Sequence, residues 1–515
     1  MGRNILLIFP NAGQDVLGIN VGLPLSILCV GTALKEAGYN VRILDERVTR
    51  NIDSSLKEAL AADPLFVGLS SMTGYQIHHG LLIARSVRDL NPRIPIVWGG
   101  VHPTIQPDST IQHNLADVVV INEGEETAVE LARTLEAGGD LRQVRGIAFK
   151  VAGRVVRTPE RPKMDLDTLP RPDYSLVDLS NYFTIGHISR TRQLQIVTSR
   201  GCPFHCGYCY LLLPELRGYR TISAQRVYDE IKYLSENHGV KSIFFYDDYF
   251  FGNRQRILEF VELLEQKPLG IQFEVSCRID FLVRESDEFL VRLRNAGFTE
   301  LLIGVESGSD RILKMIHKGF TREQIIEANR KLAKAGIGSK LSWMAGFPTE
   351  TKEDFYQTVD LMLKLTHENP FCSLTPLGIY TPYPGTELYE SCKNTFGAVF
   401  PDTLDGWADY QWQKNNNQFL SRHDFRLLTR LNVASRFFDP KLFQRFGQKR
   451  YKLLIMALYH TYGSLIRLRV RKRFFRLMPE IAVLNWLQNF YINSTHRKYQ
   501  TLHNPQAHKL KTTSF

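Results

Sequence analysis

Three cysteines stand close together in one segment of the sequence. Cys202, Cys206 and Cys209 form a C-x3-C-x2-C pattern directly after an apolar-alternating run, residues 193–197, that predicts a strand. Three thiolates on one loop can bind three irons of a [4Fe–4S] cube. The fourth iron would then lack a protein ligand, and an open coordination position can bind a substrate or cofactor. The pattern therefore predicts a reactive iron–sulfur site.

A zinc site or a chance cluster is the alternative interpretation of these cysteines. Structural zinc would need a fourth Cys or His at short spacing. His205 lies inside the loop, but it is adjacent to Cys206, and adjacent residues rarely bind the same ion. The spacing therefore favours an iron–sulfur cluster over zinc.

The segment 198–210 resembles the signature of the radical S-adenosylmethionine (SAM) superfamily, including the aromatic Tyr208 directly before the third cysteine. The resemblance implies that the open iron binds the amino and carboxylate groups of SAM. It also implies that an electron from the cluster cleaves SAM to a 5′-deoxyadenosyl radical.

Strands and helices alternate from 191 to 390, and we expect them to form an incomplete (β/α)6 barrel. Active sites of such barrels form at the carboxyl ends of the strands. The expected strands are 194–198, 242–246, 272–277, 300–305, 340–344 and 377–380. The expected helices between them are 224–237, 256–264, 287–295, 322–335 and 352–365.

The candidate SAM-binding residues are Tyr208 and several residues at or near the carboxyl ends of these strands. Asp247 could accept hydrogen bonds from the SAM ammonium, although an acidic pair such as 247–248 is also typical of a helix cap. Ser276 and Arg278 share one face of the third strand. By resemblance, Glu306 is the acid that approaches the SAM ribose. At the fifth strand end, Gly346 permits close approach to the adenine.

The first 140 residues predict a parallel, doubly wound sheet of Rossmann-like type, whose ligands bind beyond the carboxyl ends of the strands. The expected strands are 5–9, 41–44, 65–69, 94–97 and 118–121, and 25–36 and 77–91 are expected helices. No G-x-G-x-x-G follows the first strand, which argues against a dinucleotide. Candidate ligand contacts at the strand ends are Asn11, Ser70, Ser71, Met72, Thr73, Gly99, Gly100, Val101, His102, Glu123 and Gly124.

These loops resemble the cobalamin-binding domain that precedes the radical SAM core in one large subfamily, where G-G-x-H-P-T and E-G-E-E recur. Mutase-type cobalamin domains carry D-x-H-x-x-G after a strand, and its His binds cobalt from below. Here the second strand ends in the residues 44–49, L-D-E-R-V-T, without a His. The lower cobalt face stays unassigned, and His102 is either a cobalamin contact or a structural loop residue. The alternative for the whole region is a flavodoxin-like domain without a ligand.

The remaining segments differ in composition from these two domains. Residues 141–190 contain a hairpin pattern and several prolines, and we interpret them as a linker. Residues 391–500 are expected to be helical and 501–515 disordered. From 441 to 515 the chain carries fifteen Lys and Arg against the single acid Glu480, whereas the first 440 residues carry a net charge of −3.

The basic segment allows three interpretations. The apolar run 453–466 is too short to span a bilayer. Because arginines follow it at 467, 469, 471 and 473, it could form an amphipathic helix at a membrane interface. Helices that pack over the barrel mouth with a solvated basic face are an equal alternative, and nucleic-acid binding is disfavoured.

Together the motifs resemble the cobalamin-binding-domain radical SAM family and its class B methyltransferases. This implies a [4Fe–4S] cluster, SAM, cobalamin and a flavodoxin or ferredoxin as electron donor. The expected reaction methylates an unactivated carbon: one SAM methylates cobalamin and a second yields the radical. A cyclase or oxidase acting on a tetrapyrrole or lipid, and a non-catalytic cobalamin or redox sensor, are the alternatives. Seven cysteines, three in one loop and four isolated, and the lack of a signal peptide predict a cytoplasmic protein, with peripheral membrane contact as a further expectation.

Overall fold

The computed structural model describes residues 3–13, 21–182, 184–185, 191–213, 218–410, 417–435 and 452–474. The described chain divides into two compact units. The first combines residues up to 185 with the returning segment 399–410, and the second contains the remaining described residues. The expected tail at 501–515 and the expected helical stretch 475–500 lie outside the described residues.

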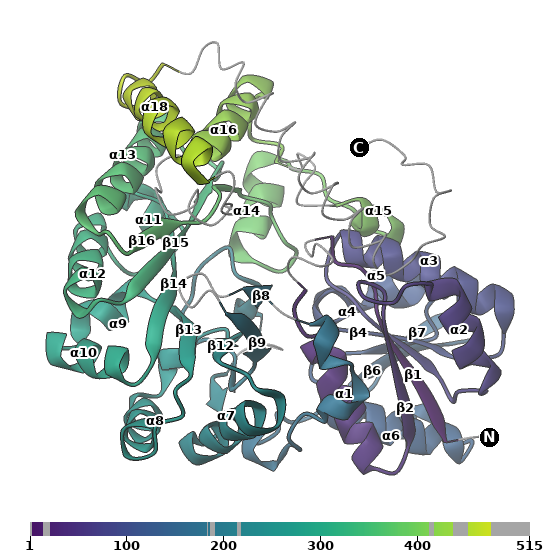
Figure 1. The fold of residues 1–515 in the computed structure, drawn as a ribbon. Coiled ribbons are helices and arrows are strands. Elements are labelled where there is room, and N and C mark those ends of the chain that lie inside the picture. The colour runs from purple at the N-terminus through teal and green to yellow at the C-terminus, as the bar shows by residue number, and fades with distance from the viewer. Residues whose placement is uncertain are drawn as a thin grey trace. The chain divides into compact units, whose positions relative to one another are not determined.

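The first unit is built on one seven-stranded sheet in the order β2-β1-β3-β4-β5-β6-β7 (Figure 1). The first five strands are parallel, and this confirms the expected doubly wound sheet. Their apolar sequences follow from burial on both faces of a parallel sheet. The strands are β1 (Asn4–Phe9), β2 (Asn40–Asp45), β3 (Val67–Ser70), β4 (Ile96–Gly99), β5 (Val118–Val120), β6 (Ile147–Val151) and β7 (Arg154–Arg157).

The hairpin expected after residue 141 is the β6–β7 pair, and it extends this sheet. β6 pairs antiparallel with β5 and with β7. Its turn residues Ala152 and Gly153 have φ values of 48° and 78°, the left-handed conformation that two-residue hairpin turns require. The stretch interpreted as a linker therefore contributes two strands to the first unit.

Helices cover the sheet of the first unit on both faces. Apolar side chains from the strands and from these helices form the core, including Leu7, Phe66, Val97 and Leu131. The helices are α1 (Leu25–Glu36), α2 (Ile52–Ala61), α3 (Tyr75–Leu90), α4 (Val101–Ile105), α5 (Pro107–Gln112), α6 (Glu125–Glu136) and, from the returning segment, α15 (Leu404–Asp409).

The second unit contains a parallel sheet in the order β16-β15-β14-β13-β12-β9, with β17 also paired to β15. Within the described residues β9 and β16 do not pair with each other, so the barrel is open, as expected. The expected sixth strand, 377–380, is the short strand β17, and a further short strand that was not expected, β16, precedes it on the other side of Pro376. The strands are β9 (Arg192–Ile196), β12 (Ser242–Phe245), β13 (Gln272–Cys277), β14 (Phe298–Glu306), β15 (Gly338–Ala345), β16 (Cys372–Leu374) and β17 (Gly378–Ile379). A short pair, β10 (Ser199–Arg200) and β11 (Arg220–Thr221), flanks the cysteine loop.

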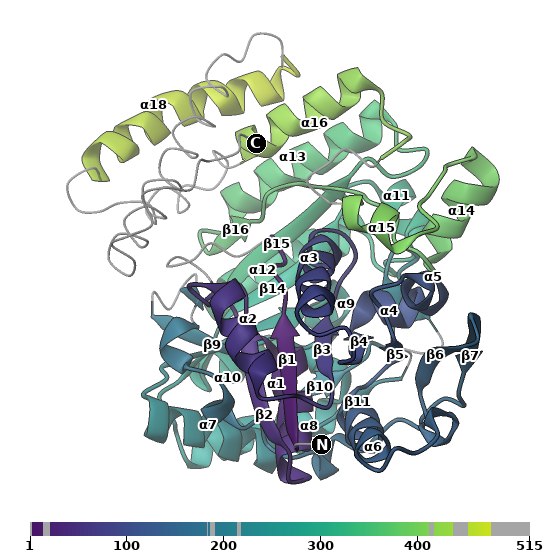
Figure 2. The ribbon, with the colours of Figure 1, turned by 90° about the vertical axis from the view of Figure 1, so that its right-hand side faces the viewer.

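Helices pack on the outer side of this sheet (Figure 2). Five of the seven barrel helices begin with a side-chain cap, and those at Thr321 and Thr351 are capping boxes. The helices of the barrel are α7 (Ala224–His238), α8 (Arg254–Gln266), α9 (Ile279–Arg284), α10 (Asp287–Asn295), α11 (Asp310–Met315), α12 (Arg322–Ala335) and α13 (Lys352–Glu368). The chain continues through α14 (Glu387–Phe396), α16 (Arg422–Ser435) and α18 (Lys452–Arg471). No helix among the described residues is both long and apolar enough to cross a bilayer.

Candidate active site

The three cysteines lie on the loop that follows β9 and β10, and the charges of Cys202 and Cys206 contribute to the raised pKa of Cys209. Cys206 is buried, and Cys202 and Cys209 are half-buried. Burial raises the pKa of Cys209 to about 12 and also raises that of Cys202. The loop begins at Gly201, where a Cβ atom would lie 2.1 Å from the carbonyl oxygen of Gly218, so glycine is required there.

The loop is held at its base by the acidic pair that follows β12. Asp247 is buried and accepts hydrogen bonds from the Thr198 amide, the Thr198 hydroxyl and the Ser199 hydroxyl at 2.5, 2.7 and 2.8 Å. The Asp248 carboxylate accepts from the Gly201 amide at 2.9 Å. Asp247, a candidate for the SAM ammonium, thus already uses both of its oxygens to position the cysteine loop.

Arg278 clamps the loop from the end of β13. Its guanidinium donates to Cys206 Sγ at 3.3 Å and to Asp280 at 2.8 Å, and also bonds to the Lys318 carbonyl. It lies 3.6 Å from the ring centroid of Phe204. A fixed cation beside the sulfur stabilises the thiolate form that binds metal. Ser276 is half-buried on the same strand.

These residues fit an iron–sulfur cluster better than a single metal ion. No group of three His, Cys, Asp or Glu side chains in the described part of the chain is spaced to hold one ion. In a cube each cysteine binds a different iron, so the three sulfurs need not converge. The buried thiols with raised pKa would be deprotonated by the irons they bind.

A buried charged network lies beside the third cysteine. The Tyr208 hydroxyl donates to Glu306 Oε1 at 3.1 Å, and Lys318 Nζ lies 3.1 Å from that hydroxyl and 3.4 Å from Glu306 Oε1. Ser342 donates to the other carboxylate oxygen at 3.2 Å. Burial, followed by the charge of Glu306, raises the pKa of Tyr208 well above its usual value, so the phenol stays a donor. The sequence reasoning identified Tyr208 and Glu306 but missed Lys318.

The Gly346 turn after β15 is held on both its amide and its carbonyl side. Glu350 Oε2 accepts from the amides of Gly346 and Phe347. Asn417 Nδ2 donates to the carbonyls of Gly346 and Tyr380 at 2.6 and 3.0 Å. Since Asn417 comes from the segment after the barrel, where no motif was recognised, sequence reasoning did not find it.

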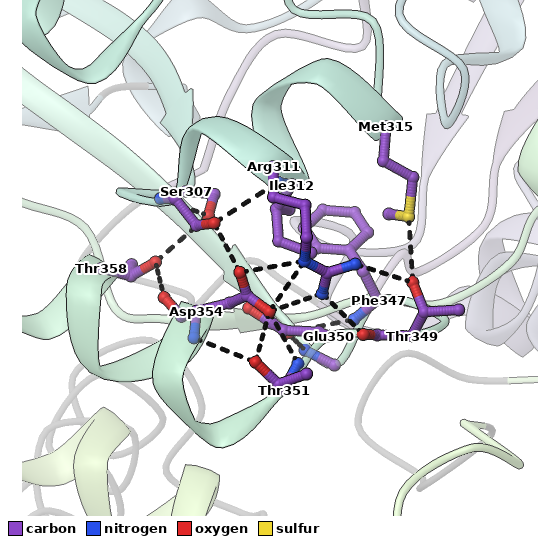
Figure 3. Close-up of polar contacts among 12 residues, drawn as sticks. Ser307, Arg311, Ile312, Met315, Phe347, Thr349, Glu350, Thr351, Asp354 and Thr358 are labelled. Carbon is purple, nitrogen blue, oxygen red and sulfur yellow. Dashed lines mark hydrogen bonds and ion pairs between the residues drawn. The ribbon is translucent and has the colours of Figure 1, made fainter.

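Figure 3 shows the polar contacts of the residues that follow this turn in sequence, from Phe347 to Asp354, with Arg311 and Ser307. Arg311 pairs with Asp354 at 2.5 Å and donates to the Thr349 carbonyl at 2.7 Å. Asp354 also accepts from Ser309 and caps α13 through Thr351. Glu350 lies between these groups, and its Oε1 is buried without a partner among the described residues. Burial raises the pKa of Glu350 to about 7.

In the first unit the predicted cobalamin loops meet at the carboxyl edge of the sheet. The Ser71 amide donates to Gly99 and the His102 amide donates to Ser71. The Asn122 amide, next to Glu123, donates to Thr104 Oγ1 at 3.0 Å, which joins the β4 and β5 loops. Ser70 Oγ lies 3.0 Å from Ser26 Oγ.

This edge has the features of a site for a large polar ligand. Gly100 has a φ of 102°, and a Cβ atom there would lie 2.8 Å from the Ser71 carbonyl oxygen. Three buried polar atoms have no partner among the described residues: Ser71 Oγ, Asn122 Oδ1 and His102 Nε2. Met72 is 41% exposed. Unpaired buried polar atoms are rare in folded proteins, and a ligand, ion or water that supplies the missing hydrogen bond is one explanation of them.

His102 and Asn11 differ in their surroundings. His102 is fully buried, its Nδ1 lies 2.9 Å from Thr73 Oγ1, and burial lowers its pKa to about 3. The Asn11 amide donates to Glu46, which also lies 2.7 Å from His79 Nδ1. Glu46 and His79, absent from the sequence-based candidates, thus stand next to Asn11 at the end of β1.

Two family models match the chain. The radical SAM superfamily model matches residues 196–362, and the B12 binding domain model matches residues 20–132. The first range contains the cysteine loop, and the second contains the predicted cobalamin loops after β3, β4 and β5 but not Asn11.

Named relatives extend the similarity over most of the chain. A Pyrococcus horikoshii protein named uncharacterized methyltransferase PH0819 is 31% identical over 75% of this chain and 82% of its own length. An anaerobic magnesium-protoporphyrin IX monomethyl ester cyclase of Synechocystis is 31% identical over 66% of this chain and 68% of its own length. A solved structure of similar fold is that of the radical SAM methyltransferase TsrM from Kitasatospora setae, with cobalamin and a [4Fe–4S] cluster bound. Its TM-score is 0.66 at 19% identity, and the match covers 89% of this chain and 99% of that chain. That likeness shows a shared fold.

Proposed function

The chain belongs to the radical SAM enzymes that carry a B12-binding domain, and from this premise we propose that it methylates an unactivated carbon of a small molecule. One observation supports this most strongly. A three-cysteine loop, which would leave one iron of a cluster open, shares a chain with a B12-binding domain in which three buried polar atoms have no partner among the described residues. The similarity to a protein named a methyltransferase favours methyl transfer.

The cofactors supply the reactive chemistry and the chain positions them. When bound, the cluster supplies the electron that cleaves SAM to a carbon radical, and cobalamin supplies the methyl group. Cys202, Cys206 and Cys209 would hold the cluster. Glu306 would orient the SAM ribose together with Tyr208. The Tyr208 hydroxyl and the Lys318 ammonium both donate to the Glu306 carboxylate and hold it in place.

The proposed reaction consumes two SAM molecules for each methylation. One SAM yields methionine and 5′-deoxyadenosine, which carries away the substrate hydrogen. The other yields S-adenosylhomocysteine after giving its methyl group, which replaces that hydrogen on carbon. A flavodoxin- or ferredoxin-type donor would supply the two electrons that this balance requires.

The test is product analysis on anaerobically reconstituted protein with cobalamin, SAM and a strong reductant. Formation of both 5′-deoxyadenosine and S-adenosylhomocysteine supports the methyltransferase. Absence of both products contradicts any radical SAM turnover and favours the sensor. Cys206→Ala should abolish 5′-deoxyadenosine formation but keep cobalamin binding, and Cys29→Ala, outside the loop, should change neither.

The second candidate function is a cyclase-type reaction on a tetrapyrrole, without methyl transfer. It is favoured by the 31% identity to the magnesium-protoporphyrin ester cyclase. This reaction would yield 5′-deoxyadenosine without S-adenosylhomocysteine in the same experiment.

We also propose that α18 places the enzyme at an anionic membrane surface. The inner side of this helix is packed, since Ile466 and Val470 are buried and the helix contacts α13. On its outer side Leu465 and Leu468 are 42% and 54% exposed. The helix has no acidic residue, and exposed leucines beside bases are typical of interfacial helices. The bases in its last turns and just after it are Arg467, Arg469, Arg471, Lys472 and Arg473.

Vesicle co-sedimentation tests this proposal. The full chain should sediment with phosphatidylserine-containing vesicles and much less with pure phosphatidylcholine vesicles. Replacing Arg467, Arg469 and Arg471 with Glu should abolish sedimentation, and high salt should weaken it. Equal recovery in the supernatant with both vesicle types would contradict it. A membrane location would suit a lipid or tetrapyrrole substrate.

A further inference from the structure

The short helix α15 follows the radical SAM core in sequence but belongs to the compact unit of the cobalamin domain. It packs against α3, whose amino end follows the predicted cobalamin loop of β3. The B12-binding match ends at residue 132, so this helix lies outside it. We propose that α15 completes the cobalamin site, with Trp407 as a positioning residue that fixes the Thr73 hydroxyl through His102.

The contacts form a continuous path from the helix to the loop. The Trp407 ring is 1% exposed, and its centroid lies 5.8 Å from that of His102. His102 is 0% exposed, and its Nδ1 lies 2.9 Å from Thr73 Oγ1. Trp407 therefore determines the position of the His102 ring, and the ring in turn determines the rotamer of Thr73.

One further contact joins α15 to the rest of the first unit, because His113 Nε2 lies 3.2 Å from Asp405 Oδ2. The Asp405 side chain is 68% exposed, so this contact contributes little. The helix is held mainly by burial of its apolar side chains, of which Trp407 is the largest and Leu404 and Ala408 are the others. The Tyr410 ring, directly after the helix, meets the Trp407 ring edge-on at 5.1 Å.

The polar atoms of His102 and Trp407 distinguish this ring pair from ordinary core packing. His102 Nε2 and Trp407 Nε1 are both buried without a partner among the described residues. The indole nitrogen only donates, and the neutral imidazole offers one donor and one acceptor. Leaving such groups unpaired is costly, whereas purely apolar side chains would fill the same space without that cost. Polar side chains kept in the core at this cost are expected to serve a neighbouring functional loop, and the loop that His102 contacts is the one that carries Thr73.

The test measures cobalamin affinity of the full chain without turnover, by anaerobic titration with hydroxocobalamin. Trp407→Ala should weaken binding about ten-fold or more, and Trp407→Phe, which keeps the ring but loses the N–H, should weaken it less. Iron content and cluster absorption should stay unchanged. Trp343→Phe is the matched control, because Trp343 is 1% exposed, lies in the other unit and also has an indole nitrogen without a partner in the described part of the chain.

A double-mutant cycle separates positioning from general stability. If Trp407 acts through His102 on Thr73, the effects of Trp407→Phe and Thr73→Val on the cobalamin Kd will not add. Additive effects, or a Trp407→Ala variant that is folded and binds cobalamin like the wild type, would overturn the proposal. If Trp407→Ala fails to fold, the cycle with Trp407→Phe still decides. Because no SAM chemistry is measured, a failed methylation assay would leave this result unaffected.

Discussion

The Tyr208 hydroxyl and the Glu306 carboxylate lie 3.1 Å apart although 98 positions separate them in sequence. Lys318, which is 4% exposed and lies in the loop between α11 and α12, also bonds to this carboxylate. The close approach depends on Gly304, where a Cβ atom would lie 2.4 Å from Glu306 Oε1. The proposed ribose acid is therefore held in place before SAM binds.

Glu306→Gln should lower the free energy of unfolding much more than Tyr208→Phe does. The first change leaves the Lys318 ammonium buried without its counter-ion, which costs about 3 kcal/mol or more of unfolding free energy. The second removes one hydrogen bond, which costs about 1 kcal/mol. Urea denaturation measures both, and a SAM titration should show weaker binding for Glu306→Gln. Equal destabilisation by the two variants would show that the lysine is not paired in solution.

Arg278→Lys should reduce cluster loading. Lysine keeps the charge but loses the planar fork that joins Cys206 Sγ, Asp280 and the ring of Phe204, weakening the loop by about 1–2 kcal/mol. Iron and sulfide content after reconstitution measures the effect. Arg254→Lys is the control, since Arg254 also pairs with a carboxylate, Glu285, and faces a ring but lies away from the cysteines. A normal iron content in Arg278→Lys would contradict the clamp.

Glu350 should make stability depend on pH in an unusual direction. Burial raises its pKa from 4.5 to about 7, so the folded state keeps the proton longer than the unfolded state. The contribution of this retained proton to the free energy of unfolding is full below pH 4.5. It declines by at most about 1.4 kcal/mol per pH unit as the pH rises toward 7, and it is absent above pH 7. Glu350→Gln removes the titration, and the difference in Tm between wild type and variant should shift over that window. Parallel Tm curves would show that Glu350 is ionised throughout.

Asn417→Ala should raise the KM for SAM by about ten-fold, because the Gly346 carbonyl and the neighbouring Tyr380 carbonyl both lose their hydrogen bond to this side chain. The cluster should remain intact. Asn432→Ala is the matched control, since Asn432 also donates to a backbone carbonyl, that of Leu377 at 2.6 Å, but away from the turn. If both variants raise the KM equally, the effect comes from general loosening of the segment after the barrel and not from the turn.

Sequence reasoning predicted the parts of the protein that depend on short stretches of chain. The cysteine spacing, the alternation of strands with helices and the loops at the strand ends are local patterns, and the structure confirms the doubly wound sheet and the open barrel. Arg278 and Asp247 were identified as site residues by their strand positions. Their contacts, however, are with the cysteine loop, because a strand position determines only the face on which a side chain lies.

What the sequence alone determined is the chemistry available: three thiolates on one loop, and strand ends that can receive SAM and cobalamin. The tertiary structure decided which side chains complete the sites. Lys318 bonds to a residue 110 positions away and Asn417 to one 71 positions away, and Trp407 returns to the first unit after the entire barrel. Such contacts arise only when distant elements pack side by side, and no periodicity or spacing within a local window carries that information.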